Sequence, residues 1–160
     1  MYYTRFHTEL CEIILVGDEN GLKFLELNTD DNKKPFEIDK SWQRSNDFFK
    51  NAVKQLKEYF TGGRKNFKID LAPDGTEFQQ HVWKELLKIP YGETRSYGEI
   101  AEAIGRPKAS RAVGAANGQN PISLIVPCHR VIGSSGKLTG YAHGLKAKQW
   151  LLEHEAKNKT

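Results

Sequence analysis

The stretch from Ser96 to Ala116, SYGEIAEAIGRPKASRAVGAA, predicts two short helices joined by a tight turn. Ser96 and Glu99 have the spacing of a capping box, in which two side chains bind the free backbone N–H groups of the first turn. This helix ends at Gly105, and Pro107 stands at or near the start of the next helix, which runs to about Ala116. Two short helices with a glycine in the turn are typical of a helix-turn-helix.

The second of these helices consists almost entirely of small residues, and Arg111 is its one long projecting side chain. Alanine and glycine let a helix pack closely inside a core. They equally let a helix enter a narrow minor groove, where one inserted side chain can fill the gap left by an extruded base. The composition of the helix leaves both interpretations open, although it lacks the side chains that usually read bases in the major groove.

Downstream, Val126–Arg130 (VPCHR) places Cys128 directly beside His129, after a proline that stiffens the approach. Thiolate is the nucleophilic form of cysteine, and a neighbouring imidazole can promote its formation near neutral pH. Adjacency alone proves no contact, because consecutive side chains often diverge. Glu155 lies in a predicted final helix over residues 145–156, which must pack back on this half of the chain, so we expect a Cys–His–Glu relay.

The main alternative to a nucleophilic cysteine with a histidine base is a zinc site built from cysteine and histidine side chains. Zinc needs about four ligands, usually in short paired spacings. The chain has two cysteines and five histidines and no Cys-x-x-Cys pair, so we expect no metal. Cys11 lies in an apolar, strand-like run and is interpreted as a small core residue rather than as a disulfide partner of Cys128.

Bulk properties narrow the class of protein. None of the 160 residues belongs to an apolar run of the roughly 20 residues that span a membrane, and the N-terminus lacks a signal-peptide core, so we expect a cytoplasmic protein. Residues 1–75 hold 12 Lys and Arg against 13 Asp and Glu, whereas residues 76–160 hold 12 against 7. The excess of basic residues in the second half is weak evidence for a polyanionic partner.

The first half predicts a small antiparallel sheet and a helix. Strands are expected at residues 6–7, 10–16 and 22–27, with a turn at Asn20-Gly21, and a further strand is possible at 67–71. A helix capped by Ser45 or Asn46 would bury Phe48, Phe49, Ala52, Val53, Leu56, Tyr59 and Phe60. We place the domain boundary at Pro73–Gly75, which gives subdomains of residues 1–75 and 76–160.

Two more helices are expected in the second half. One begins at the capping box of Thr76 and Gln79, and its buried stripe comprises Phe78, Val82, Trp83, Leu86 and Leu87. The final helix would bury Leu145, Trp150, Leu151 and either His154 or Leu152. Residues 133–144 between them are glycine-rich and predict a loop or hairpin.

The motif Pro127-Cys128-His129-Arg130 closely resembles the active-site motif of the O6-alkylguanine-DNA alkyltransferases, the methylated-DNA–protein-cysteine methyltransferases. The resemblance covers about residues 76–156 and extends, in order, over Phe78-Gln79, Gly92-Glu93, Ser96-Tyr97, Arg111-Ala112-Val113-Gly114, Asn120-Pro121, Ile125-Val126 and Trp150–Glu155. It implies an α+β fold of two subdomains. The first would be RNase H-like α/β with a small antiparallel sheet, and the second winged-helix-like, with the helix-turn-helix and the active site.

The resemblance also implies catalytic roles. Cys128 would accept the alkyl group, His129 would take the thiol proton through a water, and Glu155 would orient His129. Tyr97 would twist the phosphate backbone and donate to N3 of the leaving guanine. Asn120 would brace the turn between the reader helix and the active-site loop.

Further positions are implied to contact DNA or the base. Arg111 would replace the flipped base in the stack, and Gly98, Arg106 and Ser134 would touch the DNA backbone. The carbonyls of Val131 and Cys128, with the loop at Tyr141 and Ala142, would line the base pocket. His143 stands where relatives commonly have glycine, which could narrow that pocket.

The implied function is direct reversal of O6-alkylguanine damage in double-stranded DNA by a suicide methyltransferase, with O4-alkylthymine as a lesser substrate. The S-alkyl cysteine is a thioether that no neighbouring group hydrolyses, so each molecule reacts once and needs no cofactor. We expect a stand-alone monomer. Two alternatives remain: a DNA-binding regulator that senses alkylation or oxidation at Cys128, and a cysteine hydrolase, which would turn over repeatedly.

Overall fold

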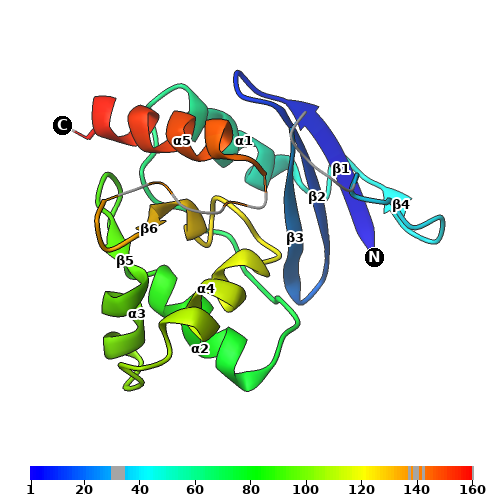
Figure 1. Cartoon of the computed structure of the whole chain (residues 1–160). Coiled ribbons are helices and arrows are strands. Elements are labelled where there is room, and N and C mark those ends of the chain that lie inside the picture. The colour runs from blue at the N-terminus through cyan, green and yellow to red at the C-terminus, as the bar shows by residue number, and fades with distance from the viewer. Residues whose placement is uncertain (30–34, 137, 139–140, 142, 160) are drawn as a thin grey trace.

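The computed structural model describes residues 1–29, 35–136, 138, 141 and 143–159. Figure 1 shows a β-sheet at one side of the molecule, a group of helices at the other end, and helices α1 (Lys50–Phe60) and α5 (Leu145–Lys157) next to each other. The fold is α+β, as predicted. One apolar core runs through both halves of the chain.

The sheet has the strand order β3-β2-β1-β4, with β1 at Tyr2–His7, β2 at Glu12–Asp18, β3 at Gly21–Asn28 and β4 at Gln43–Arg44. The first three strands are antiparallel, whereas β4 runs parallel to β1. The middle of β2, residues 13–16, is buried on both faces, which explains why its sequence is continuously apolar rather than alternating.

The outer edge of β3 joins the two halves of the chain. The Leu25 N–H donates to the Pro121 carbonyl at 2.9 Å, and the Ser123 N–H donates to the Leu25 carbonyl at 3.2 Å. Leu25 and Ile122 form a parallel bridge. The segment that leads to Cys128 is therefore held against the sheet by backbone hydrogen bonds.

The helices of the second half are α2 (Glu77–Leu86), α3 (Tyr97–Ala103) and α4 (Ser110–Gly118). Both predicted capping boxes are present, with reciprocal hydrogen bonds between Thr76 and Gln79 and between Ser96 and Glu99. A short parallel pair, β5 (Arg95–Ser96) with β6 (Val131–Ile132), lies beside the 3-10 helix η1 (Cys128–Arg130). The sequence did not predict this pair, because each strand has only two residues.

Several local predictions were wrong. Residues 67–71 form no strand, because their contact with β3 is limited to a single bridge between Leu22 and Leu71. Neither Ser45 nor Asn46 caps α1, whose N-cap is Phe49, since Ser45 instead accepts from the Phe48 N–H in the preceding turn. Pro107 lies in a turn before α4, and that helix begins later than predicted.

Three apolar side chains that were expected in the core are exposed. They are Phe48 (42% exposed), Leu87 (47%) and Leu145 (49%). Each lies at or just beyond a helix end, where the helical periodicity no longer determines which face is covered. The predicted loop over residues 133–144 lies partly outside the described residues.

Candidate active site

Cys128 begins η1 at the end of a tightly folded and buried segment, residues 122–131. The Val126 N–H donates to the Ile122 carbonyl at 3.1 Å, and the Cys128 N–H donates to the Val126 carbonyl at 2.8 Å. Within the described chain, Leu124 is the one non-glycine residue with a positive φ, 76°. Such strained backbone persists only where its surroundings hold it, and it often marks functional sites.

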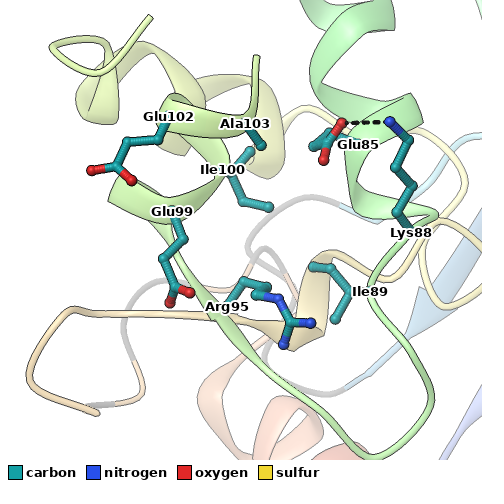
Figure 2. Close-up of a pocket in the computed structure, with 8 residues that line it drawn as sticks. All are labelled: Glu85, Lys88, Ile89, Arg95, Glu99, Ile100, Glu102 and Ala103. Atoms are coloured by element: carbon teal, nitrogen blue, oxygen red, sulfur yellow. Dashed lines mark hydrogen bonds and ion pairs between the residues drawn. The ribbon is translucent and has the colours of Figure 1, made fainter. Parts of the chain in front are cut away.

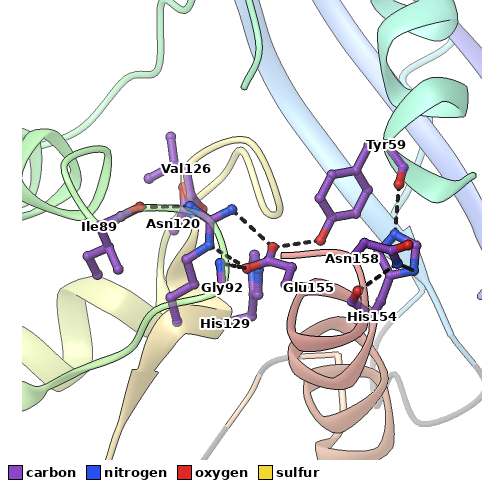
Figure 3. Close-up of polar contacts among 10 residues, drawn as sticks. Tyr59, Ile89, Gly92, Asn120, Val126, His129, His154, Glu155 and Asn158 are labelled. Carbon is purple, nitrogen blue, oxygen red and sulfur yellow. Dashed lines mark hydrogen bonds and ion pairs between the residues drawn. The ribbon is translucent and has the colours of Figure 1, made fainter. Parts of the chain in front are cut away.

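Asn120 braces this segment through both ends of its amide. Its Nδ2 donates to the Val126 carbonyl at 2.9 Å, and its Oδ1 accepts from the Ile122 N–H at 3.0 Å. One side chain thus ties together two backbone groups on either side of the strained Leu124. The bracing role expected for Asn120 stays a prediction, and these contacts support it (Figure 3).

Glu155 of α5 is the hub of a buried polar network (Figure 3). Its Oε2 lies 2.8 Å from His129 Nε2. Arg130 donates two hydrogen bonds to the same carboxylate, from Nε to Oε1 at 2.8 Å and from Nη2 to Oε2 at 3.0 Å. The Tyr59 hydroxyl and the Gly92 N–H complete the set at 2.7 and 3.2 Å. The sequence analysis predicted the approach of His129 to Glu155 but missed the other three partners.

Arg130 also joins the site to the turn that follows α2 through its remaining nitrogen. Its Nη1 donates to the Ile89 carbonyl at 2.7 Å. Because a guanidinium is permanently charged, a buried Arg130 requires the bidentate carboxylate and this carbonyl to offset the loss of water. The Arg in the VPCHR motif therefore has a clear structural task, which its position next to Cys128 and His129 could have suggested.

The network fixes the protonation of His129. Burial alone would raise the pKa of Glu155, but hydrogen bonds and charges from His129 and Arg130 hold it well below its usual range. Burial lowers the pKa of His129 despite the opposing effect of Glu155. An ionised carboxylate can only accept, so Nε2 carries the proton of a neutral imidazole and Nδ1 is the basic nitrogen. Nδ1 is buried and has no hydrogen-bond partner among the described residues.

Cys128 is a neutral thiol in the resting protein. Burial raises its pKa, and the hydrogen-bonding groups of Asn120, Tyr141 and Ser123 only partly offset that effect, as does the positive charge of Lys148. The pair is therefore a thiol and a neutral base rather than a preformed thiolate–imidazolium pair.

Lys148 of α5 is a site residue that the sequence analysis missed. It is fully buried, and its Nζ donates to the Val131 carbonyl at 2.6 Å. That carbonyl is one of those expected to line the base pocket. Burial lowers the pKa of Lys148, although the nearby Cys128 opposes the shift. Tyr141, another expected pocket residue, has a buried hydroxyl close to the sulfur but without a well-formed hydrogen bond to any described residue, and Ala142 lies outside the described residues.

Most of the residues expected to contact DNA lie on α3, on α4 and in the turn between them, whereas Ser134 follows β6 (Val131–Ile132). Tyr97 is the first residue of α3 and is half-buried, as is Gly98, while Arg106 and Ser134 are exposed. Arg111 projects from the exposed face of α4, whose opposite face buries Val113, Ala116 and Asn117. The small-residue helix thus packs on one side only and leaves Arg111 available to a partner.

A separate cavity of about 490 Å³ between α2, β5 and α3 is lined by Glu85, Lys88, Ile89, Arg95, Glu99, Ile100, Glu102 and Ala103 (Figure 2). None of the residues predicted to act in catalysis or DNA binding lines it. Figure 2 also shows the ion pair between Glu85 and Lys88, at 3.0 Å, at its rim.

Within the described part of the chain, no group of three or more His, Cys, Asp or Glu side chains is arranged to hold a metal ion. Among those same residues, no helix is long and apolar enough to cross a membrane.

Comparisons with known proteins show the family of the chain. The family model for the DNA-binding domain of 6-O-methylguanine DNA methyltransferase matches residues 77–157, and the model for the ribonuclease-like domain of the same protein matches residues 1–73. A methylated-DNA–protein-cysteine methyltransferase of Methanosarcina acetivorans is 57% identical over 155 residues, which are 97% of this chain and 98% of the relative. One from Mycobacterium tuberculosis is 61% identical over 114 residues, 71% of this chain and 69% of the relative.

The solved structures give the same result. The crystal structure of Mycobacterium tuberculosis OGT in complex with DNA matches with a TM-score of 0.91 and 47% identity over 99% of this chain and 94% of that one. The structure of the M. tuberculosis O6-methylguanine methyltransferase gives a TM-score of 0.89 and 48% identity, over 98% and 93% of the two chains. Cys128, His129 and Glu155 lie together in one buried site of this chain. The chain therefore belongs to the 6-O-methylguanine DNA methyltransferase family.

Proposed function

We propose that the protein repairs double-stranded DNA by transferring the alkyl group, above all methyl, from O6 of an alkylated guanine to the sulfur of Cys128. The observation that carries this proposal is the contact between His129 Nε2 and the ionised Glu155 at 2.8 Å. It leaves His129 as a neutral base one residue from a buried thiol, in a chain of the alkyltransferase family.

The thiol proton leaves toward His129. The basic Nδ1 of His129 accepts it through an intervening water, and the imidazolium that forms is stabilised by the Glu155 carboxylate. Because burial keeps Cys128 protonated in the resting protein, the reactive thiolate forms only as the reaction begins. A soft, activated sulfur is suited to displacement at an alkyl carbon.

The leaving group is guanine. As the S–C bond forms, the bond between that carbon and O6 breaks, and its electron pair moves into the purine. Tyr97, at the start of α3, donates its hydroxyl proton toward N3 and offsets the negative charge that develops there. The product S-alkyl cysteine is a thioether, so the protein is consumed after one transfer.

The substrate has to leave the base stack before it can react. O6 of a paired guanine is inaccessible inside the duplex, so the nucleotide is extruded through the minor groove. Arg111, exposed on α4, enters the stack in its place, and the small residues around it allow close approach. Gly98, Arg106 and Ser134 contact the DNA backbone, and the pocket beside Val131 and Tyr141 receives the base.

The protein acts as a monomer without a cofactor. Its two cysteines are both free, which suits a reducing compartment such as the cytoplasm. O4-alkylthymine is a second, lesser substrate of the same site.

Transfer of a labelled methyl group tests the proposal. The protein is incubated with duplex DNA that carries one O6-[methyl-labelled]guanine, and label in the protein is measured against total protein. We expect label to rise to at most one equivalent, and Cys128→Ala to abolish the transfer while Cys11→Ala leaves it unchanged. Repeated turnover would indicate a hydrolase, and binding without transfer would indicate a regulator; either result contradicts the proposal.

A further inference from the structure

The edge of the sheet beside β1 is only partly covered. β4 pairs with β1 at Tyr2 and Tyr3 alone, whereas β1 continues to His7. Figure 1 shows β4 as a short strand at this outer edge of the sheet. Within the described part of the chain, no strand pairs with residues 4–7 on this side of β1. These residues therefore form a free edge, with which a further strand could pair.

The backbone groups of Arg5 and His7 face this free edge. The Tyr3 carbonyl accepts from the Ser45 N–H at 2.9 Å, so the odd-numbered residues of β1 turn their backbone groups toward β4. In an antiparallel pair the N–H and C=O of one residue point to the same side, and Arg5 and His7 therefore present theirs beyond the end of β4. Arg44 Nη2 donates to the Arg5 carbonyl at 3.4 Å, which places that carbonyl on the same side.

A groove of about 610 Å³ lies between this stretch of β1 and α1. Phe6 of β1 and Val53 of α1 line it, and both are half-buried, so they give the groove apolar surface that a partner can still reach. Thr4 is buried and donates to Asn46 Oδ1 at 2.6 Å, which holds the segment before α1 against β1. A groove between a strand edge and a helix suits an extended peptide, which can bind by adding a strand to the sheet.

The groove is also basic. Three exposed lysines of α1 line it, at positions that share one face of the helix: Lys50, Lys54 and Lys57. The other charged side chains of the groove already have partners. Arg5 pairs with Glu12 at 2.7 Å, and Glu58 pairs with Arg64 at 3.1 Å. None of the three lysines forms an ion pair with any residue that the structure describes, so their charges are available to an acidic partner.

The spacing of the lysines suits an extended chain. Lys50 and Lys54 are about 6 Å apart along the helix axis, at 1.5 Å per residue. Alternate side chains of an extended peptide lie about 7 Å apart on one face. Acidic residues at alternate positions of a peptide can therefore face successive lysines.

We propose that the groove between β1 and α1 binds an acidic segment of a partner protein in an extended conformation. The segment adds to the sheet as a strand beside Arg5 and His7, and its carboxylates pair with the three lysines. This binding goes beyond the proposed function, since no residue assigned to alkyl transfer or to DNA contact lines the groove. A phosphate backbone would satisfy the lysines but would leave the strand edge, Phe6 and Val53 without a partner, so these features favour a peptide over a nucleic acid.

A fluorescein-labelled peptide of alternating Glu and Val tests the proposal by fluorescence anisotropy with the DNA-free protein. We expect saturable binding, and Lys54→Glu should weaken it about tenfold or more, because it replaces attraction by repulsion. Lys84→Glu, at an exposed lysine of α2, is the matched control and should bind as the wild type does. Urea unfolding should show equal stability of the two variants. No saturable binding, or equal affinity of both variants, would overturn the proposal.

The addition of a strand has its own test. Two versions of the peptide are N-methylated at alternate residues, one at every Glu and the other at every Val. The version that has lost the N–H groups facing β1 should bind at least tenfold more weakly than the other. Hydrogen exchange of the Arg5 and His7 amides, followed by NMR, should slow when the unmethylated peptide binds. Equal affinity of the two methylated peptides together with unchanged exchange would contradict strand addition.

Other occupants of the groove would give different results. An oligothymidylate that binds more tightly than the peptide, and loses affinity in Lys54→Glu but not in Lys84→Glu, would assign the groove to nucleic acid. Dimerisation of the free protein that Lys54→Glu abolishes would assign it to a second copy of the chain. Either result would overturn the proposal. Because no measurement here uses methyl transfer, failure of the proposed function would leave these outcomes unchanged.

Discussion

The carboxylate of Glu155 lies 2.8 Å from Nε2 of His129, and both side chains are buried completely. The two residues are 26 positions apart and come together because α5 packs back against η1. This contact sets the tautomer of His129 and also balances the charge of Arg130. Catalytic chemistry and folding stability therefore depend on the same carboxylate.

Replacement of Glu155 by Gln should impair both properties. The amide leaves Arg130 buried without its counter-charge, for which we expect a loss of about 3–5 kcal/mol in the free energy of unfolding. The rate of methyl transfer should fall about 100-fold or more, because the imidazolium of His129 is no longer stabilised. Urea unfolding and single-turnover kinetics measure the two effects. Glu153→Gln, an exposed change on the same helix, should alter neither, and a fully active, stable E155Q would contradict the assignment of Glu155.

Asn120 should be needed for the geometry of the active-site segment. Asn120→Ala removes the side-chain hydrogen bonds that hold the backbone around Leu124, and we expect a loss of about 1–3 kcal/mol in stability together with slower methyl transfer. Asn120→Asp keeps the acceptor for the Ile122 N–H but loses the donor to the Val126 carbonyl, so it should fall between Ala and wild type. If Asn120→Ala reacted at the wild-type rate, the bracing role would be refuted.

Arg111 should affect the rate of alkyl transfer from duplex DNA but not from the free base. Because it is exposed on α4 and has no contact with Cys128, Arg111→Ala should react normally with free O6-alkylguanine but slowly with the same base in a duplex. The ratio of the two second-order rate constants measures the effect, with the free base as an internal control. An equal loss on both substrates would mean that Arg111 has a structural role.

Stability should depend on pH through opposing effects of His143 and Glu26. His143 has a depressed pKa of about 4, so its contribution is present above its unfolded pKa of about 6.5 and is lost as pH falls toward 4. Glu26 has a raised pKa of about 7, so its contribution is present below its unfolded pKa of about 4.5 and is lost as pH rises through 7. Between about pH 4.5 and 6.5 the two slopes have opposite signs and largely cancel.

Single substitutions should therefore uncover each slope. Glu26→Gln should steepen the loss of stability on acidification by up to about 1.4 kcal/mol per pH unit, and His143→Gln should shift the slope in the opposite direction by a similar amount. Chemical denaturation at a series of pH values measures both. Identical slopes in the wild type and the two variants would show that these groups do not titrate as the burial of both requires.

Local chemistry explains which features were predictable. The two capping boxes mark the starts of α2 and α3 because a side chain and a backbone group a few residues apart are sufficient to form them. Residues 67–71, by contrast, alternate like a strand, but only Leu71 bridges to Leu22 in the folded chain. Whether an extended segment joins a sheet depends on a partner that the segment itself does not encode.

The same distinction holds for the site. Cys128 and His129 could be identified from one short motif, and Glu155 from the helix that had to pack against it. Tyr59 lies 96 residues from Glu155, and the ring of His143 lies opposite Glu26 from the other end of the chain. Such contacts arise from the packing of the two halves, and no sequence spacing indicates them.

Mass spectrometry of the protein after reaction tests the central claim most directly. The protein is incubated with excess duplex DNA containing O6-methylguanine and is then digested and sequenced peptide by peptide. The account predicts one methyl group per molecule, located on the sulfur of Cys128, with Cys11 unmodified and guanine restored in the DNA. A methyl group on any other residue, or restored guanine without a methylated Cys128, would contradict it.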